Sequence, residues 1–419
     1  MSQQQNSEKY DLVIVGGGMV GSTLACLLAP HHLRMAVIET FIPPDYVVDE
    51  PYDLRVSAIS AASREVFEQA GVWDGIQARR VSAYENMFVW DATGNGQIHF
   101  QAAELGVAQL GHLIENRMIQ LALLERLQAS DTVDLYAPCR LQQLTIQANP
   151  NPNEQMSSIP ASAAAPVQIR LEDGTMLSSD LVVGADGAHS FVRQHLNMGW
   201  QSEDYGQKGL VTVVETSKAH QATAWQCFMP TGPLAFLPLG DSPFAHRSSI
   251  VWSLPADQAD AYLHQDEPTF MQTLGTAFQH RLGDITAVSQ RAAFPLKGAQ
   301  AQDYVQPHVA LLGDAAHTIH PLAGLGANLG IKDAKQLAEV LIQAKQQQRA
   351  LGAYSTLRRY ERARRGDNLL TMKTMEAFKL VFGNQMMPWQ MMRNRGLQWV
   401  DQATWLKQRF MRQAMGLGI

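Results

Sequence analysis

Glycines at a fixed spacing near the N-terminus form a pattern suited to binding a dinucleotide. Gly16, Gly18 and Gly21 follow a short apolar run, residues 11–15. The first glycine of such a turn permits a tight bend, the second lets a pyrophosphate approach the backbone, and the third lets the helix pack on the strand. Glu39 ends the next apolar run, where a carboxylate accepts hydrogen bonds from ribose hydroxyls and disfavours the 2′-phosphate of NADP. We therefore expect the dinucleotide to contact Gly16, Gly18, Met19, Val20, Gly21 and Glu39.

Two later segments favour FAD over NAD as the bound dinucleotide. Asp186 and Asp314 each follow an apolar run, so each carboxylate stands at the end of an expected strand and can hold a ribityl or ribose hydroxyl. A glycine-rich turn follows Asp314 and leads into a helix that begins at residues 325–328. Its N-terminus offers N–H groups and positive potential to the negative charge of a reduced flavin. The predicted flavin contacts here are Asp186, Gly313, Asp314, Gly324, Gly326, Ala327 and Asn328.

The elements that must position these residues alternate between strand and helix. Residues 11–15, 19–29 and 35–38 read as strand, helix and strand, which is one βαβ unit. The residue pattern changes near Gly199, where strands are expected at 209–216 and 248–254 and a helix at 268–282. Residues 309–312 then show the pattern of a buried strand again, which indicates a return to the first domain. We therefore predict an α/β fold in which a Rossmann-like FAD-binding domain is interleaved with an α+β substrate domain and followed by a helical C-terminal region. The predicted FAD-binding parts are 1–79, 113–198 and 296–368, the substrate parts are 80–112 and 199–295, and the C-terminal helices are 369–419.

Composition narrows the class of protein. The 419 residues are 46% hydrophobic with a formal charge of -6 and both signs scattered, so we expect no nucleic-acid partner. Three isolated cysteines indicate a reducing compartment, and no apolar signal-peptide core or long apolar run is found, so we expect a cytoplasmic protein. Residues 389–419 are rich in Met and carry five Lys or Arg and one acid. That tail fits either peripheral contact with the inner membrane face or ordinary helix packing.

In this order, the three cofactor segments resemble the group A flavoprotein aromatic hydroxylases, which have the para-hydroxybenzoate hydroxylase-like fold. Residues 53–60 (DLRVSAIS) and 320–324 (HPLAG) are similar to the ubiquinone-biosynthesis hydroxylase family, and the likeness runs from about Tyr10 to the C-terminus. Members usually carry Gln where this chain has Leu325.

The resemblance implies roles for single residues. Glu39 would bind the adenosine ribose, Arg117 the phosphate and ribose region of FAD, and Asp314 the ribityl chain. Arg55 would lie near the flavin and Pro321 beside its reacting face. The segment of Asp186 and Gly187 would serve both FAD and the transient binding of NAD(P)H, because the family has no separate nicotinamide domain.

The resemblance also implies a reaction. NAD(P)H would reduce FAD, O2 would add at the flavin C4a atom, and the resulting hydroperoxide would hydroxylate the ring of a polyprenyl phenol or benzoquinol, with C5 or C6 favoured. Residues 233–239 resemble the strand that lies over the flavin in the family, which makes Phe236 a candidate for contact with the substrate. His320 and Pro321, from the segment after Asp314, are the other candidate catalytic residues. No metal-ligand spacing is found. A reductase of a prenylated substrate and a non-catalytic scaffold of a biosynthetic complex remain alternatives, and possible partners include that complex and a second copy of the chain.

Overall fold

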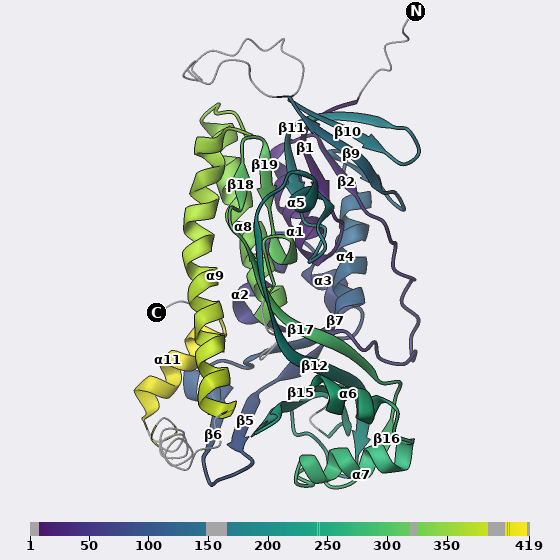
Figure 1. Cartoon of the computed structure of the whole chain (residues 1–419), viewed down its shortest axis with the longest axis vertical. Helices are drawn as coiled ribbons and strands as arrows, with labels where there is room; N and C mark the ends of the chain where they lie inside the picture. The colour runs from purple at the N-terminus through teal and green to yellow at the C-terminus, as the bar shows by residue number, and fades with distance from the viewer. Residues whose placement is uncertain are drawn as a thin grey trace, which may run out of the picture.

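The computed structural model describes residues 8–147, 166–240, 242, 244–318, 325–383, 399, 401 and 403–416. The predicted site residues His320, Pro321 and Gly324 lie outside these residues, as does the side chain of Leu325. Figure 1 shows an elongated molecule with one large sheet near each end and the long helix α9 along one side.

The upper sheet in Figure 1 is the predicted Rossmann-like part. Its described strands run in the order β18-β19-β11-β1-β2-β8, with β9 and β10 attached to β11 as an antiparallel extension. β1 pairs in parallel with both β2 and β11, and β11 pairs in parallel with β19. Helix α1 joins β1 to β2, which confirms the predicted βαβ unit, and packs against α4 and α8. The strands are β1 Glu8–Val15, β2 Met35–Ile38, β8 Val133–Tyr136, β9 Leu141–Ile146, β10 Val167–Leu171, β11 Met176–Gly184, β18 Val305–Gln306 and β19 Val309–Leu311. The helices are α1 Met19–Leu28, α4 Asn116–Gln128 and α8 Leu325–Gln346.

The lower sheet is antiparallel except where β13 pairs with β5, and its described order is β20-β17-β12-β15-β14-β13-β5-β6, with β16 beside β12. The long strands β12 and β17 carry the chain between the two ends of the molecule (Figure 1). A small sheet of β3, β7 and β4 completes the β-structure of the described residues. The strands are β3 Val56–Ser60, β4 Ser82–Tyr84, β5 Asn86–Asp91, β6 Gln97–Gln101, β7 Gly111–Glu115, β12 Trp200–Thr216, β13 Thr223–Met229, β14 Gly232–Leu239, β15 Arg247–Pro255, β16 Ile285–Val288, β17 Ala292–Ala301 and β20 His317–Thr318.

Short helices complete the connections between these sheets. Helix α7 ends at Ala277, earlier than the predicted 282, because Gln279 and His280 adopt φ values of 55° and 48°, which a right-handed helix does not tolerate. The remaining helices are α2 Ala61–Gln69, α3 Trp73–Gln77, α5 Phe191–His195, α6 Ala256–Leu263 and α7 Glu267–Ala277, with single turns η1 Ala29–His31, η2 Ala102–Leu105 and η3 Gly313–Ala315.

Each end of the molecule has its own large hydrophobic core. The larger core surrounds the upper sheet and includes the inner faces of α1, α4 and α8. It also contains four fully buried side chains of α8: Ile331, Ala334, Leu337 and Leu341. The second core lies between one face of the lower sheet and helices α6 and α7. The opposite face of the lower sheet is therefore left to border a cavity.

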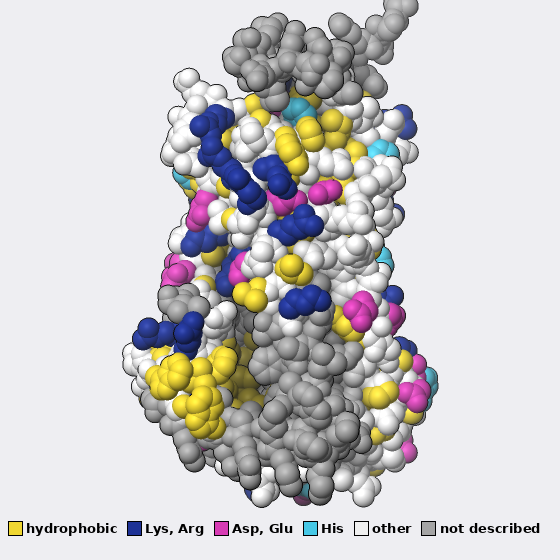
Figure 2. All heavy atoms as spheres, turned by 60° about the vertical axis from the view of Figure 1, so that its left-hand side comes forward, with side chains coloured by type: hydrophobic (Ala, Val, Ile, Leu, Met, Phe, Trp, Pro, Cys, Tyr) yellow, Lys and Arg dark blue, Asp and Glu magenta, His cyan; other side chains and the backbone are white. Residues whose placement is uncertain are grey.

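The C-terminal part contains the helices α9 Tyr354–Gly383 and α11 Thr404–Ala414. Helix α9 runs without a break across the expected domain boundary at 368, and the boundaries at 112 and 295 likewise fall inside β7 and β17. Within the described residues no helix is long and apolar enough to cross a membrane. Figure 2 shows hydrophobic side chains gathered at the end of the molecule where α11 lies, with Lys and Arg side chains beside them.

Candidate active site

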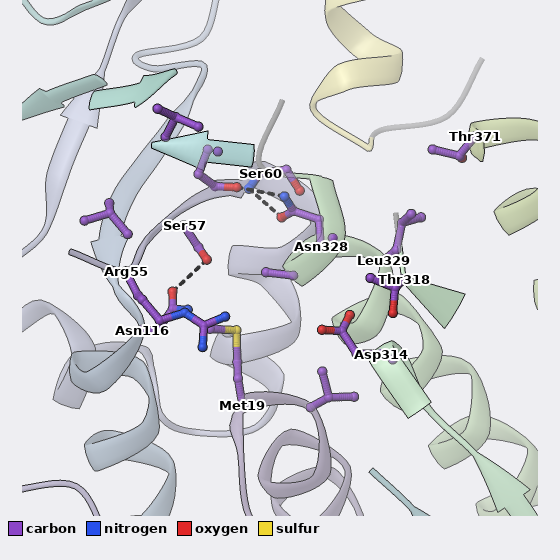
Figure 3. A pocket seen from close by; sticks show the side chains of 18 of the residues that line it. Met19, Arg55, Ser57, Ser60, Asn116, Asp314, Thr318, Asn328, Leu329 and Thr371 are labelled. Atoms are coloured by element: carbon purple, nitrogen blue, oxygen red, sulfur yellow. Dashed lines mark hydrogen bonds between the residues drawn. The ribbon is translucent and has the colours of Figure 1, made fainter. Parts of the chain in front are cut away.

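A cavity of about 2470 Å³ lies between the two sheets. It borders the carboxyl ends of β1, β11 and β19, where open α/β sheets bind their ligands. The turns after those strands form one side of the cavity, and the free face of the lower sheet forms the other. Figure 3 shows side chains from these separate segments pointing toward this space.

The first glycine turn has the geometry that the sequence predicts. Gly16 has φ of 105°, and a Cβ there would come 2.3 Å from the carbonyl oxygen of Ala185. A Cβ on Gly21 would come 2.0 Å from the Gly16 carbonyl, so the third glycine lets α1 pack closely. Around Gly18 nothing lies within 4 Å of a built Cβ, and no side chain caps α1. The free N–H groups of this helix end therefore face open space, as a pyrophosphate requires.

The two predicted adenosine contacts differ in their place. Glu39 directly follows β2 and is not among the lining residues, and its Oε1 accepts a hydrogen bond from the Phe41 N–H at 2.9 Å. Arg117 lines the cavity, where its Nε contacts Asp53 Oδ2 at 2.9 Å and its Nη2 contacts Glu50 Oε1 at 2.5 Å. Arg117 therefore fixes the loop of residues 44–53 at the edge of the cavity, and its contact with FAD remains a prediction.

Asp314 projects into the cavity from the turn after β19 (Figure 3). Gly313, at φ of 54°, places this turn against Val20 of α1. Burial among protein atoms raises the pKa of Asp314, although the charges of His317 and Arg55 oppose that rise. Nearby, the Thr318 Oγ1 also borders the cavity, is buried and has no hydrogen-bond partner among the described residues. This turn thus presents a carboxylate and an unpaired hydroxyl, which suit the hydroxyl-rich ribityl chain of a flavin.

Behind this turn lies a buried polar cluster that the sequence analysis did not identify. Asp333 is fully buried and accepts hydrogen bonds from His317 Nε2 at 2.5 Å, Arg364 Nε at 2.7 Å and the Gly313 N–H at 3.2 Å. Arg364 Nη2 also donates to Asn368 Oδ1 at 2.7 Å. Burial opposes ionisation of Asp333, but the interactions with His317 and with the Arg364 guanidinium outweigh it and lower the pKa of Asp333. The cluster ties α8 and α9 to the turn that carries Asp314.

A second buried arginine holds the same turn from the other side. Arg193 donates from Nη1 to the Ala315 carbonyl at 2.8 Å and from Nη2 to the Ala188 carbonyl at 2.6 Å, and its guanidinium lies 3.7 Å from the ring centroid of Trp200. Asp186 accepts from the Val192 N–H at 3.2 Å, while its Oδ1 is buried and has no hydrogen-bond partner in the described part of the chain. Burial raises the pKa of Asp186. The turns after β11 and β19 are therefore fixed to each other by Arg193.

The N-terminus of α8 is fixed to β3 at the floor of the cavity. Asn328 accepts from the Ser60 N–H at 2.9 Å and donates to the Ala58 carbonyl at 2.7 Å (Figure 3). Gly326 and Ala327 line the cavity, and Arg55 borders it from the chain before β3. The structure thus places most of the described cofactor residues of the prediction on the lining of this cavity, whereas Gly16, Gly21, Glu39 and Asp186 are not among the lining residues. Asn328 lines the cavity and also uses its side chain to anchor the helix.

The predicted substrate wall is correct as a strand, but Phe236 is the wrong residue. Phe236 is fully buried and stacks on Phe278 at 3.6 Å between ring centroids, in the core on the far face of β14. Successive side chains of a strand point to opposite faces, so its neighbours point the other way. The cavity is lined instead by Pro233, Ala235 and Leu237. Neighbouring strands contribute further apolar wall residues and two polar ones: Met87, Val89, Ala224, Gln226, Phe228, Val251 and Ser253.

The open glycine turn, the cavity-facing carboxylate and the unpaired Thr318 hydroxyl all fit FAD. A family model described as an FAD binding domain matches residues 9–368. The chain is 37% identical over 411 residues to the 3-demethoxyubiquinol 3-hydroxylase of Escherichia coli K12, covering 98% of this chain and 100% of that protein. It is 34% identical to the ubiquinone hydroxylase UbiL of Rhodospirillum rubrum over 97% and 89% of the two chains. The chain belongs to the FAD-dependent ubiquinone hydroxylase family.

Solved structures of flavin monooxygenases share the fold of this ubiquinone hydroxylase family member. The p-nitrophenol 4-monooxygenase PnpA of Pseudomonas putida DLL-E4 superposes with a TM-score of 0.75 at 18% identity, over 97% of this chain and 98% of that one. The probable FAD-dependent monooxygenase pqsL of Pseudomonas aeruginosa gives 0.73 at 22% identity, over 93% and 99%. The predicted fold, the FAD cofactor and the assignment to the flavin monooxygenases are therefore confirmed.

Proposed function

We propose that this protein hydroxylates the aromatic ring of a polyprenyl phenol or benzoquinol in ubiquinone biosynthesis, using NAD(P)H and O2. The observation that carries this proposal is the arrangement of the cavity, in which the apolar wall of β14 faces the Asp314 turn across the space. An electron-rich ring held on that wall would lie against the flavin. The names of the E. coli and R. rubrum relatives support a ubiquinone precursor as the substrate.

The bound FAD would supply the oxygen-insertion chemistry, and the protein would orient the ring and exclude water. Pro233, Ala235 and Leu237 would pack against one face of the ring. Gln226 is 7% exposed and presents a polar side chain on this apolar wall, so we propose that its amide binds the ring hydroxyl. That hydrogen bond would set which ring carbon faces the cofactor. C5 and C6 remain the favoured positions, and carbon 3 of a demethoxyubiquinol, from the name of the E. coli relative, joins them as a candidate.

The nicotinamide would bind transiently at the turn after β11. Gly187, Ala188 and His189 line the cavity there, beside the buried Arg193. Because this turn also borders the predicted FAD site, one segment can serve both molecules in sequence.

We propose that the protein works in the cytoplasm as a peripheral protein of the inner membrane face. On α11 the side chains of Trp405, Arg409 and Arg412 follow at the spacing of one helix face, and all three are exposed. Trp405 is 64% exposed, and neither arginine forms an ion pair with another described residue. Interfacial tryptophan and unpaired cations suit an anionic bilayer surface. Membership of a ubiquinone-biosynthesis complex and formation of a homo-oligomer are further proposals, which the tail region could serve.

The pathway assignment is tested by deleting the gene in its source organism and identifying the quinone precursor that accumulates by mass. We expect loss of ubiquinone and a precursor one hydroxyl short, restored by the wild-type gene and not by an Asp314→Ala variant. A reductase would leave a precursor with an unreduced bond instead. If the protein were only a scaffold, the wild-type gene and the Asp314→Ala gene would both restore ubiquinone in the deletion strain. An intact ubiquinone pool would contradict the pathway.

A further inference from the structure

The cavity is larger than an ordinary small-molecule site. Sites for drug-sized ligands occupy about 300–1,000 Å³, whereas this cavity measures about 2470 Å³. The residues that we expect to bind FAD account for the side formed by α1, the Asp314 turn and the start of α8. A remaining part runs along β5 and β6 to the C-terminal helix α11. We call this part the α11 arm.

The lining of the α11 arm is apolar and adaptable. It is formed by Met87, Phe100 and Leu110 on one side and by Met411 and Met415 of α11 on the other. Leu110, Met411 and Met415 are buried in a small hydrophobic core that Met87 and Phe100 pack against. Unbranched methionine side chains fit irregular apolar shapes, so this lining suits a flexible hydrocarbon chain better than a rigid polar ligand.

Helix α11 is fixed as the roof of this arm. Lys407, which is 6% exposed, contacts Glu104 Oε1 at 2.7 Å and Asp401 Oδ1 at 3.3 Å. The Met415 carbonyl accepts a hydrogen bond from the Ala62 N–H of α2 at 3.1 Å. These contacts anchor the helix at both ends, so the arm is a built feature of the fold.

The arm opens to the outside at Phe410. Phe410 lines the cavity and is also 46% exposed, so it stands at the mouth. Trp405 and Arg409 lie on the same helix at the spacing of the outward face. Figure 2 shows a hollow with hydrophobic side chains beside the hydrophobic cluster at this end of the molecule. The mouth therefore lies next to the surface proposed above to meet the bilayer.

We propose that the α11 arm binds the polyprenyl tail of the substrate, with the ring on the β14 wall and the distal isoprenes leaving past Phe410. The inference rests on the proposed function and adds to it a recognition site for the tail. Burial of each CH2-sized group strengthens binding about fourfold. Each added isoprene unit that fits the arm should therefore lower the KM at least tenfold, until the arm is filled and further units have little effect.

The experiment compares ring analogues with no tail and with one, two and three isoprene units, assayed with the FAD-loaded enzyme in detergent solution. Both hydroxylated product and equilibrium binding are measured. Ala414 lines the arm and is exposed, so Ala414→Phe should narrow it without disturbing a core. Ala103→Phe, on an exposed position outside the cavity lining, is the matched control. We expect Ala414→Phe to raise the KM for tailed analogues at least tenfold, with the tail-free analogue and the control unchanged.

The outcomes separate the two proposals. Turnover that is independent of tail length in the wild-type enzyme overturns the arm and leaves the hydroxylase activity, even if Ala414→Phe does not fold. Equal effects of Ala414→Phe on tailed and tail-free analogues also overturn it. Binding that strengthens with tail length, without any hydroxylated product, supports the arm and contradicts the proposed function. If no analogue is either hydroxylated or bound, both proposals are overturned.

Discussion

The cluster around Asp333 predicts a large and specific effect of one substitution. Asp333→Asn keeps the shape of the side chain and removes its charge. His317 and Arg364 lose a charged partner at 2.5 Å and 2.7 Å, and Arg364 is only 6% exposed. Arg364 keeps two other contacts, with Asp367 Oδ2 at 2.6 Å and with Asn368. In the variant the buried Arg364 guanidinium therefore keeps some of its hydrogen-bonding and charged partners but loses the Asp333 carboxylate.

Breaking a buried pair by removing one partner costs about 3–5 kcal/mol. Because two partners of Arg364 remain, we expect the lower end, about 3 kcal/mol, which corresponds to a fall in Tm of about 3–4 °C for a chain of this size. The Gly313 N–H also bonds to Asp333, so the Asp314 turn should loosen and FAD should bind more weakly. The pKa of Asp333 is lowered from 3.8 in the fold. The stability difference from wild type is therefore full above pH 3.8 and shrinks as the pH falls through the folded pKa.

The assay is thermal unfolding at one scan rate and one fixed FAD concentration, since bound ligand adds stability. Glu339→Gln is the matched control because Glu339 is an exposed acid on the same helix. Surface substitutions of this kind change the free energy of unfolding by about 0.5 kcal/mol or less. An Asp333→Asn protein as stable as this control, with unchanged FAD affinity, would refute the positioning role of the cluster.

Three further predictions address other parts of the molecule. Gly16→Ala places a Cβ 2.3 Å from a carbonyl oxygen, so the purified protein should lose FAD absorbance at 450 nm, about the usual flavin maximum. Burial lowers the pKa of His112 from 6.5 to about 4, so stability should fall as the pH drops from 6.5 toward 4, and His112→Gln should flatten that limb of a denaturation series. Trp405→Ala combined with Arg409→Gln should weaken sedimentation with anionic vesicles about tenfold; equal binding of both proteins would argue for a protein partner at this surface.

The cofactor side of the cavity could be predicted because its signals are local in the chain. Gly16 and Gly18 lie in the turn between β1 and α1, and Asp314 lies in the turn directly after β19, so their place behind an apolar strand puts them at the carboxyl edge of the sheet. The resemblance then identified the cofactor as FAD.

The substrate wall shows where this reasoning stopped. Both faces of β14 are apolar, with Phe236 in one core and Ala235 on the cavity, so alternation revealed a strand and could not say which face binds the substrate. Because side chains alternate between the two faces of a strand, the sequence shows which face is buried only when the other face is polar.

The buried arginines could not be predicted for a different reason. Arg193, Asp333 and Arg364 meet the cofactor turns from segments far apart in the chain, and their hydrogen bonds depend on the tertiary fold. In a single sequence each of them reads as an ordinary surface charge. Charged residues are almost never fully buried unless paired, and the pairing becomes visible only in the structure.

The central claim, oxygen insertion by an FAD enzyme, is tested most directly with ¹⁸O2. The FAD-loaded protein is mixed with NADH and a short-tailed demethoxyubiquinol under labelled oxygen, and the product is analysed by mass and by NMR. We expect one labelled oxygen atom per product, on a single ring carbon, with NADH consumed in step. NADH oxidation without label in the product, or product formed under nitrogen, would contradict the account.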